Sequence, residues 1–236
     1  MAAPIYSGPV NGTPVRLILV RHGETVSNLE GRWQGQSDSP LSERGVLQAE
    51  ALAEALAAEP IQAVYSSDMG RAIATGAPVA ARHGLQVTTD ARLREIHVGT
   101  FTDQLAAENR REHPELMDAW AHRPWTVTFP EGESLQAVWA RIEDFLAETL
   151  PRHRGETVVL VSHGATAQVV RALGLGKPGQ ELWHGSFENC QITRMEWSAE
   201  AGFSMVEECD VRHLELVGSV GGWRVLDTTE SATVEK

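Results

Sequence analysis

One stretch indicates the fold most directly: Val15-Arg16-Leu17-Ile18-Leu19-Val20, followed at once by Arg21-His22-Gly23. A nearly continuous apolar run of this length is typical of a strand that is buried on both faces of a sheet. Glycine permits a sharp backbone turn directly after such a strand. The stretch therefore predicts a central buried strand that delivers a histidine at its carboxyl end.

A second apolar run, Thr157-Val158-Val159-Leu160-Val161, leads to another His-Gly pair at His163-Gly164. The remaining pattern predicts shorter strands over 61–65, 85–88, 188–197 and 202–210, and helices over about 43–59, 69–83, 134–150 and 165–173. Strands that alternate with helices are typical of an α/β protein. We predict a three-layer α/β/α sandwich around a mainly parallel mixed sheet, with a helical insert over the active site.

Local signals bound the first of these helices. Ser42 is the expected N-cap, Leu47, Leu52 and Leu56 are expected on related faces, and Pro60 follows the expected end near residue 59. In parallel sheets, ligands bind beyond the carboxyl ends of the strands. Two strands that each deliver a histidine at that edge therefore indicate a functional site.

The 236 residues fit one domain of ordinary size. We expect a flexible arm over residues 1–14, one catalytic domain over 15–217 with a helical insert over about 101–150, and a loose tail over 218–236. The arm contains three prolines and two glycines, and the tail is rich in Gly, Thr, Ser and Glu.

Composition narrows the classes of partner and compartment. Hydrophobic residues make up 42% and charged residues 22% of the chain, which is typical of a globular protein. A net charge of −12 disfavours nucleic acid and anionic membranes as partners. Two cysteines, no apolar run long enough for a membrane helix and no signal peptide predict a cytoplasmic protein.

The residues around the first histidine suit phosphate chemistry. Arg21 places a permanent cation beside His22, which would repel a metal ion but can bind a phosphate. A neighbouring positive charge also favours the neutral imidazole, the form that attacks as a nucleophile. The alternative for either His22 or His163 is a histidine that merely ends a strand, and the repeated pattern makes that alternative weaker.

Arg71 is the next candidate. We expect Ser67 or Asp68 to cap a helix whose first turn carries this arginine. A cation is unfavourable at a helix N-terminus unless an anion binds there, so its position indicates an anion site. The alternative is an ordinary solvated arginine on the surface.

Glu95 is a candidate general acid. It lies between the apolar residues Leu93 and Ile96, which predicts partial burial. The alternative is a structural carboxylate paired with Arg92 or Arg94.

At this point the sequence resembles a known family. The matching blocks are residues 19–25 with Asn28, 31–36, 40–45, 66–68 with Arg71, 93–95, 132–134 and 161–164. In this order they are similar to the histidine phosphatase superfamily, the phosphoglycerate-mutase-like proteins, over about residues 15–195. A lone Arg-His-Gly would be a weak signal, whereas an ordered series of blocks is specific.

The resemblance implies roles for individual residues. His22 would be the nucleophile that becomes phosphohistidine, and Glu95 the proton donor. The residues that would hold the transferring phosphoryl group are Arg21, Arg71 and His163. Further residues matching phosphate or substrate positions are Thr25, Asn28, Gln34, Gly35 and Gly164. For the favoured hydrolase, neither a metal nor a cofactor is expected.

The same resemblance leaves the reaction open between hydrolase and mutase. Glu95 and His163 are 68 residues apart, whereas cofactor-dependent mutases carry a longer insertion with an Arg pair that binds the substrate carboxylate. Arg110-Arg111 lies too close to Glu95 to match that pair. We therefore favour a phosphomonoester hydrolase acting on a sugar phosphate or a phosphoglycerate-like metabolite, with the mutase as the alternative.

Three further classes are weighed against this one. A metal hydrolase would need histidine and carboxylate spacings such as His-x-x-x-His, which the sequence lacks. A non-catalytic phosphate-binding regulatory protein would have lost a catalytic residue, and all of them are present. A protein-phosphohistidine phosphatase would lack much of the insert. Relatives in the superfamily often form dimers, so a homodimer is left open.

Substrate selection is expected in the insert and in Trp33, which lies within a matched block. Aromatic residues could form an apolar roof, namely Phe101, Trp120, Trp125, Phe129 and Trp139. Basic residues could meet a charged substrate, namely Arg110, Arg111, His113 and Arg123. The alternative is that the tryptophans only pack the insert. After Gly99 the run Thr100-Phe101-Thr102-Asp103 departs from the common phosphatase pattern, which affects the prediction of the substrate more than that of the chemistry.

Overall fold

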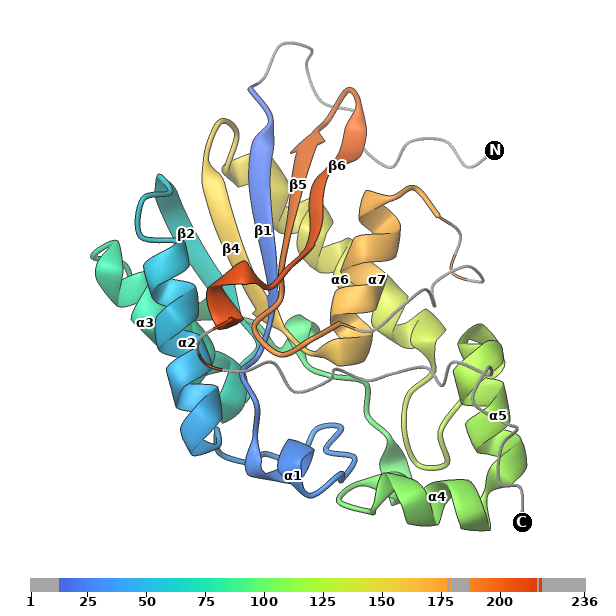
Figure 1. Ribbon diagram of the computed structural model, residues 1–236. Helices are drawn as coiled ribbons and strands as arrows, with labels where there is room; N and C mark the ends of the chain where they lie inside the picture. The colour runs from blue at the N-terminus through green and yellow to red at the C-terminus, as the bar shows by residue number, and fades with distance from the viewer. Residues whose placement is uncertain (1–12, 178, 180–186, 216, 218–236) are drawn as a thin grey trace, which may run out of the picture.

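The computed structural model describes residues 13–177, 179, 187–215 and 217 (Figure 1). The expected N-terminal arm, apart from Thr13 and Pro14, and the expected C-terminal tail lie outside the described residues.

A six-stranded mixed sheet forms the centre of the molecule, in the order β3-β2-β4-β1-β5-β6. The strands are β1 Val15–Arg21, β2 Ile61–Ser66, β3 Val87–Thr89, β4 Thr157–Ser162, β5 Ile192–Ser198 and β6 Gly202–Asp210. The first four are mutually parallel where they pair, and β5 and β6 are antiparallel to their neighbours. The predicted mainly parallel mixed sheet is confirmed.

Helices cover both faces of this sheet. Figure 1 shows α2 and α3 on one face and α6 and α7 on the other. The helices are α1 Val26–Leu29, α2 Glu43–Ala55, α3 Gly70–Arg82, α4 Ala106–Glu112, α5 Pro114–His122, α6 Leu135–Thr149 and α7 Gly164–Gly174. Short 3-10 turns span Ala91–Leu93, Gly99–Phe101, Pro124–Thr126, Leu150–Arg152 and Arg212–Leu214. The three-layer sandwich is thus confirmed.

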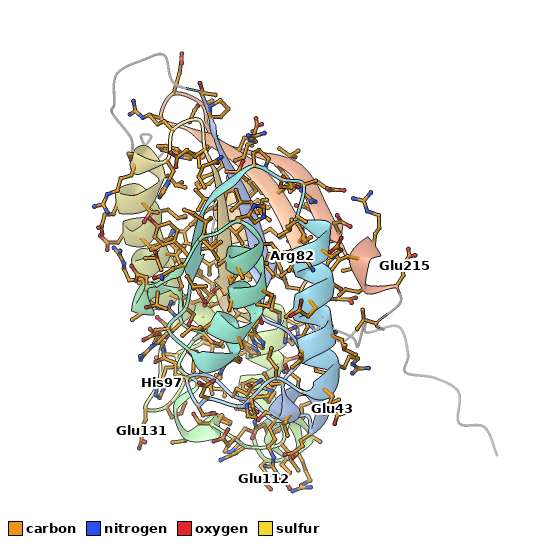
Figure 2. All side chains as sticks on the ribbon, turned by 90° about the vertical axis from the view of Figure 1, so that its left-hand side faces the viewer. Glu43, Arg82, His97, Glu112, Glu131 and Glu215 are labelled. Carbon is orange, nitrogen blue, oxygen red and sulfur yellow. The ribbon has the colours of Figure 1, made fainter. Side chains whose placement is uncertain are left out.

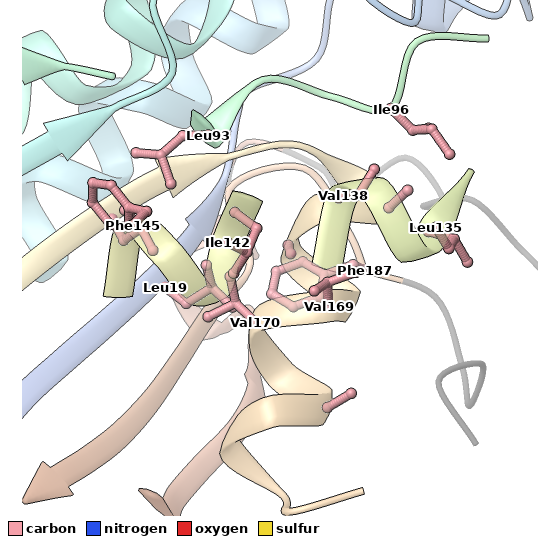
Figure 3. Close-up of a cluster of buried hydrophobic side chains, with 14 of the residues drawn as sticks. Leu19, Leu93, Ile96, Leu135, Val138, Ile142, Phe145, Val169, Val170 and Phe187 are labelled. Atoms are coloured by element: carbon pink, nitrogen blue, oxygen red, sulfur yellow. The ribbon is translucent and has the colours of Figure 1, made fainter. Parts of the chain in front are cut away.

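Two hydrophobic cores form because successive strand residues point to opposite faces. On β1, Leu17 and Leu19 belong to the core under α6 and α7, whereas Ile18 and Val20 belong to the core under α2 and α3. Figure 3 shows Leu19 among α6 and α7 side chains such as Ile142. Burying a side chain of this size contributes about 2 kcal/mol. This two-sided burial explains why the run at 15–20 is apolar almost throughout.

The insert lies at the carboxyl end of the parallel strands, where Figure 1 places α4 and α5. In Figure 2, Glu112 at the end of α4, Glu131 in the segment before α6 and Glu43 at the start of α2 all lie toward this end, whereas Arg82 at the far end of α3 does not. The insert therefore lies on the side of the sheet where ligands bind in folds of this type.

Several predicted boundaries differ from the observed ones. Helix α2 ends at Ala55 with Leu56 as C-cap, several residues before Pro60, and β3 begins at Val87. Strand β5 begins at Ile192, later than expected. The expectation for Leu47 was wrong: it is 58% exposed, because five residues of helix rotate it well away from the buried Leu52.

Both cysteines are free thiols. Within the described part of the chain, no helix is long and apolar enough to cross a membrane.

Candidate active site

The two strand-ending histidines meet because β1 and β4 are parallel neighbours. Arg21 is aligned with Ser162 in the register of this pair, so the next residue of each strand leaves the sheet at the same edge. The imidazole rings of His22 and His163 lie 5.1 Å apart between centroids. Two histidines separated by 141 residues of sequence are therefore brought into one site by strand pairing.

Hydrogen bonding fixes the tautomer of His22. Its Nδ1 lies 2.7 Å from the carbonyl oxygen of Gly23, and because a carbonyl can only accept, Nδ1 carries the proton. In the neutral ring, Nε2 then holds the free lone pair. Burial, and then the charges of Arg71 and Arg21, lower the pKa of His22 well below its usual value. The lowered pKa agrees with the predicted neutral imidazole, and the nucleophilic role of His22 stays a prediction.

His163 has the opposite tautomer. Arg71 donates from Nε to Nδ1 of His163 at 3.2 Å, and since arginine can only donate, Nδ1 is the acceptor and Nε2 carries the proton. This Nε2–H group is buried and has no hydrogen-bond partner among the described residues. Burial, followed by the charge of Arg71, holds the pKa of His163 well below its usual value. A buried unused donor of this kind needs an acceptor from a ligand.

Two buried guanidinium groups flank the histidines. Arg21 is 4% exposed and donates from Nη1 to the carbonyl of Phe187 at 2.6 Å, while its buried Nε has no partner in the described structure. Burial lowers the pKa of Arg21 to about 10, so it stays charged at neutral pH. Arg71 is 1% exposed, and the alternative of a solvated surface arginine is wrong. Positive charge buried in this way is stabilised by a bound anion.

Arg71 is held rigidly by its surroundings. Besides its bond to His163, it donates from Nη1 to the carbonyl of Ser37 at 2.6 Å and from Nη2 to the carbonyl of Gly35 at 2.8 Å. Three donors of one planar group are thus used to fix its orientation.

The expected cap of α3 was wrong. The N-cap residue is Met69, and the carboxylate of Asp38 accepts from the backbone N–H groups of Gly70 at 2.7 Å and Arg71 at 3.4 Å. Asp68 is instead paired with Arg94 at 2.6 Å. A carboxylate from a distant loop replaces the local cap because the local one is engaged elsewhere.

Glu95 is half-buried, as predicted, and its carboxylate lies against the first turn of α7. Oε2 accepts from the backbone N–H of Ala165 at 3.1 Å, and Oε1 accepts from that of Thr166 at 3.2 Å. The alternative pairing with Arg92 or Arg94 is wrong, since these two arginines bind Asp90 and Asp68 respectively.

A cleft opens between these groups and the insert. Its lining residues are Arg21, His22, Asn28, Arg32, Trp33, Gln34, Gly35, Arg71, Glu95, Ile96, Val98, Trp120, Gly164 and Ala165. The site residues predicted from the sequence therefore line one cleft, except for two residues that contact lining residues instead.

The exceptions are His163 and Thr25, which do not line the cleft in the described structure. His163 lies fully buried behind it, against His22. Thr25 caps α1 by accepting from the N–H of Asn28 at 3.1 Å, and its own N–H donates to Oδ1 of Asn28 at the same distance. Thr25 thus orients a lining residue.

Several contributors to the site carry no clear signal in the sequence. Arg32 lies within a matched block and lines the cleft, but its residue type alone does not place it there. Ile96 and Val98 also line it, and nothing in their local pattern indicates this. Asn189 donates from Nδ2 to the carbonyl of His22 at 2.8 Å, a contact from a distant loop that carries no sequence signal.

The insert contributes less to the cleft than expected. Trp33, Phe101, Trp120 and Phe129 form one buried aromatic cluster, in which the Trp120 and Phe129 rings are 4.9 Å apart, but only Trp33 and Trp120 of these line the cleft. The two other insert tryptophans pack against each other at 5.6 Å between centroids, namely Trp125 and Trp139. For these two, the packing alternative describes the structure better.

The basic residues of the insert lie outside the cleft lining. Arg111 pairs with Glu112 at 2.8 Å, and Arg123 pairs with Asp118 at 3.4 Å on the exposed surface. Arg110 and His113 are also exposed. The insert instead helps to orient Arg32, a lining residue from outside it: Nη1 of Arg32 donates to the carbonyl of Asp103 at 2.8 Å.

The chemistry of the cleft is that of an anion site with a nucleophile. No group of three His, Cys, Asp or Glu side chains suited to a metal ion occurs among the described residues. Arg21, Arg71 and His22 line the cleft, and the buried Nε2–H donor of His163 lies directly behind them. Such an arrangement supplies the positioning and charge stabilisation that phosphoryl transfer requires.

Comparison with known proteins agrees with this chemistry. The family described as the histidine phosphatase superfamily (branch 1) matches residues 17–208. Phosphoserine phosphatase 1 of Hydrogenobacter thermophilus is 38% identical over 179 residues, covering 76% of this chain and 85% of the relative. A probable phosphoglycerate mutase of Yersinia pestis is 31% identical over 206 residues, covering 86% of this chain and 96% of the relative.

A solved structure is similar as well. A mycobacterial glucosyl-3-phosphoglycerate phosphatase superposes with a TM-score of 0.74 at 32% sequence identity, covering 83% of this chain and 99% of that one. Most of the described chain therefore has a counterpart in that structure.

Proposed function

The chain belongs to branch 1 of the histidine phosphatase superfamily, and from this premise we propose that it hydrolyses a small phosphorylated metabolite through a phosphohistidine at His22. One observation carries the proposal. The lone pair on Nε2 of His22 is held beside two buried arginines and the unused Nε2–H donor of His163. A candidate nucleophile and three groups able to bind phosphate oxygens thus occur in one place.

In the first step, Nε2 of His22 attacks phosphorus in line with the leaving alcohol oxygen. The P–O bond breaks as the N–P bond forms, and Glu95 in its protonated form gives its proton to the leaving oxygen. Arg21, Arg71 and His163 bind the equatorial oxygens, where charge is carried in the transition state.

In the second step, water replaces the alcohol. Glu95, now a carboxylate, takes a proton from the water as its oxygen attacks phosphorus. The N–P bond breaks, His22 recovers its neutral state, and inorganic phosphate leaves. Each group ends the cycle in the state in which it began.

The part of the cleft away from the phosphate supports a substrate of mixed character. Ile96, Val98 and Trp120 line it with apolar surface, and Arg32 adds one cation. Nη2 of Arg32 has no acceptor among the described residues, whereas its Nε and Nη1 bind Glu30 and Asp103. We infer an alcohol that carries one anionic group, as in phosphoserine or a phosphoglycerate.

A mutase remains the second candidate, because of the likeness to the probable phosphoglycerate mutase. Against it, the Arg110-Arg111 pair lies on the exposed surface of α4 and does not line the cleft. The hydrolase therefore has the stronger support.

We propose that residues 15–217 act as one catalytic domain in the cytoplasm, with neither metal nor cofactor, and that a homodimer is compatible with this activity. The two free cysteines support a reducing compartment.

The test is hydrolysis of p-nitrophenyl phosphate and 3-phosphoglycerate, in EDTA, by the wild type and by His22→Ala. Phosphate release that is lost in His22→Ala supports the hydrolase. Formation of 2-phosphoglycerate from 3-phosphoglycerate in a 2,3-bisphosphoglycerate-primed assay, without phosphate release, would make the protein a mutase. Phosphate binding without turnover would support the regulatory protein.

A further inference from the structure

Gly132-Glu133-Ser134 belongs to the matched blocks but has no part in the proposed chemistry. Glu133 lies outside the cleft lining in the described structure, and its side chain is 24% exposed. Its Oε2 accepts from the backbone N–H of His97 at 2.8 Å. Its own backbone N–H donates to the carbonyl of His97 at 2.8 Å. Glu133 therefore holds the segment that directly follows Glu95.

Arg141 of α6 completes this arrangement. Its Nε lies 3.3 Å from Oε1 of Glu133, and its Nη2 lies 3.3 Å from Oε2 of the same carboxylate. From the other side of its guanidinium, Nη2 donates to the carbonyl of Glu95 at 3.2 Å and Nη1 donates to the carbonyl of Arg92. One guanidinium thus connects two points of the backbone around Glu95 to helix α6.

A third element supports the same peptide. Nε2 of Gln36, from the loop that also provides Gly35, donates to the carbonyl of Glu95 at 3.0 Å. This carbonyl consequently accepts from two side chains that come from different elements, the loop with Gln36 and helix α6 with Arg141. Such a peptide is more restrained than a loop position held by a single contact.

Close backbone packing fixes the turn that carries Glu133. A Cβ atom at Gly99, whose φ is +56°, would lie 1.8 Å from the carbonyl oxygen of Pro130. A Cβ atom at Gly132 would lie 2.3 Å from the carbonyl oxygen of His97. Glycine at both positions lets the turn dock directly on the segment following Glu95.

We propose that Arg141 and Glu133 are positioning residues for Glu95. They fix the backbone on both sides of this residue, while the first turn of α7 orients its carboxyl group toward the leaving oxygen. Because proton transfer requires hydrogen-bond reach, a shift of about 1 Å in the backbone would cost far more in rate than in substrate binding. The proposal rests on the proposed function, in which Glu95 protonates the leaving alcohol.

The test compares two aryl phosphates that depend differently on protonation of the leaving group. Phenyl phosphate releases phenol, whose anion is more basic than p-nitrophenolate, so its cleavage depends more on a general acid than that of p-nitrophenyl phosphate. The measured quantity is kcat/KM, which covers only the steps up to departure of the alcohol. The variants are Arg141→Gln, Arg141→Lys and Glu133→Gln, with Glu95→Gln as the benchmark.

In Arg141→Gln we expect kcat/KM for phenyl phosphate to fall about tenfold more than that for p-nitrophenyl phosphate, in the same direction as in Glu95→Gln. Arg141→Lys keeps the positive charge but loses the planar guanidinium fork. Its relative loss of kcat/KM for phenyl phosphate should lie between those of the wild type and Arg141→Gln. Glu133→Gln keeps an acceptor for His97 but loses the ion pair, and should show a smaller effect of the same kind. The inhibition constant for inorganic phosphate should stay within about twofold, because the phosphate-binding groups are untouched.

The matched control is Arg92→Gln. Arg92 lies beside this network, but its side chain binds Asp90, Asp144 and Glu148 on the surface, so its loss should leave the ratio of the two substrates unchanged. Equal losses for both substrates in Arg141→Gln and Glu133→Gln, or none in either, would overturn the proposal. If Arg141→Gln does not fold by circular dichroism, Glu133→Gln and Arg141→Lys decide the matter. A wild type that hydrolyses neither substrate would instead refute the proposed function, and this proposal with it.

Discussion

Arg71 and His163 are joined by a hydrogen bond of 3.2 Å from Nε of the arginine to Nδ1 of the histidine. This bond gives His163 the tautomer opposite to that of His22, whose Nδ1 is protonated toward the carbonyl of Gly23. Two neutral imidazoles with their ring centroids 5.1 Å apart therefore present different groups, a lone pair on Nε2 of His22 and an N–H donor on Nε2 of His163. The difference arises from their partners and not from their local sequence, which is His-Gly in both cases.

Replacing the nucleophile should abolish turnover. In His22→Ala we expect phosphate release to fall at least about a thousandfold, because the side chain proposed to form the covalent intermediate is removed. Wild type quenched in alkaline denaturant, but not the variant, should carry a phosphoryl group on residue 22 by mass spectrometry, because the N–P bond of phosphohistidine is stable in base and labile in acid. Exposed His113→Ala is the control and should keep full activity; a phosphorylated His22→Ala protein would place the nucleophile elsewhere.

Arg71→Lys should be a severe change despite the retained charge. The ammonium of lysine cannot replace the three bonds that Arg71 makes to Ser37, Gly35 and His163. We expect kcat/KM to fall about a hundredfold and inhibition by inorganic phosphate to weaken about tenfold. Arg82→Lys, on the exposed end of the same helix, is the matched control. Similar kinetics in both variants would show that only the charge of Arg71 matters.

Stability should decrease in acid because of the buried histidines. Their pKa values are held well below 6.5 in the folded protein, chiefly by burial, whereas the unfolded chain takes up protons near pH 6.5. The unfolded state therefore binds more protons, and the free energy of unfolding falls as pH decreases below about 6.5. Each histidine contributes a slope of about 1.4 kcal/mol per pH unit until its folded-state pKa is reached.

Urea unfolding between pH 7.5 and 5, in phosphate-free buffer, measures this slope. Removing one of the two groups in His163→Gln should make the dependence shallower than in the wild type. His122→Gln is the control, because His122 is exposed on α5 and its loss should leave the slope unchanged. Parallel curves for wild type and His163→Gln would contradict the assignment of a neutral buried imidazole.

Arg32 should select among substrates rather than support the chemistry. In Arg32→Ala we expect kcat/KM for 3-phosphoglycerate to fall about tenfold, which corresponds to one partly exposed ion pair of about 1.4 kcal/mol. Glycerol 3-phosphate has a similar size but no carboxylate, so its kcat/KM should be nearly unchanged. Arg111→Ala, outside the cleft, should alter neither value. Equal losses for both substrates in Arg32→Ala would rule out a role in binding the carboxylate.

Gly45→Ala should destabilise the loop that follows His22. A Cβ atom at this position would lie 1.9 Å from the carbonyl oxygen of Glu24, which must then move. We expect the free energy of unfolding to fall by about 3 kcal/mol in chemical denaturation. Gly76→Ala in α3 is the control, since its Cβ would come no closer than 3.3 Å to any side chain and alanine favours a helix. It should change stability by less than about 1 kcal/mol.

The central sheet could be predicted from the sequence because the pattern that defines it is local. Residues 15–20 and 157–161 are apolar almost throughout, and only a strand covered on both faces requires that. The ends of α2 and the exposure of Leu47 were harder to predict, because helix termination and helix rotation depend on neighbours that the local sequence does not specify.

For the candidate site too, the residues with a local sequence signal could be predicted, and the contacts between distant segments could not. The sequence alone determined the two His-Gly strand ends, the neighbouring Arg21, and the residue types at 71 and 95. A polar pair directly after an apolar run is a local pattern that can be read without the tertiary structure. It could not reveal that Asp38 caps α3, that Asn189 holds the carbonyl of His22, or that Arg32 lines the cleft. Those contacts join segments far apart in the chain, so only the parallel pairing of β1 with β4 and the docking of the insert at their carboxyl ends decided them.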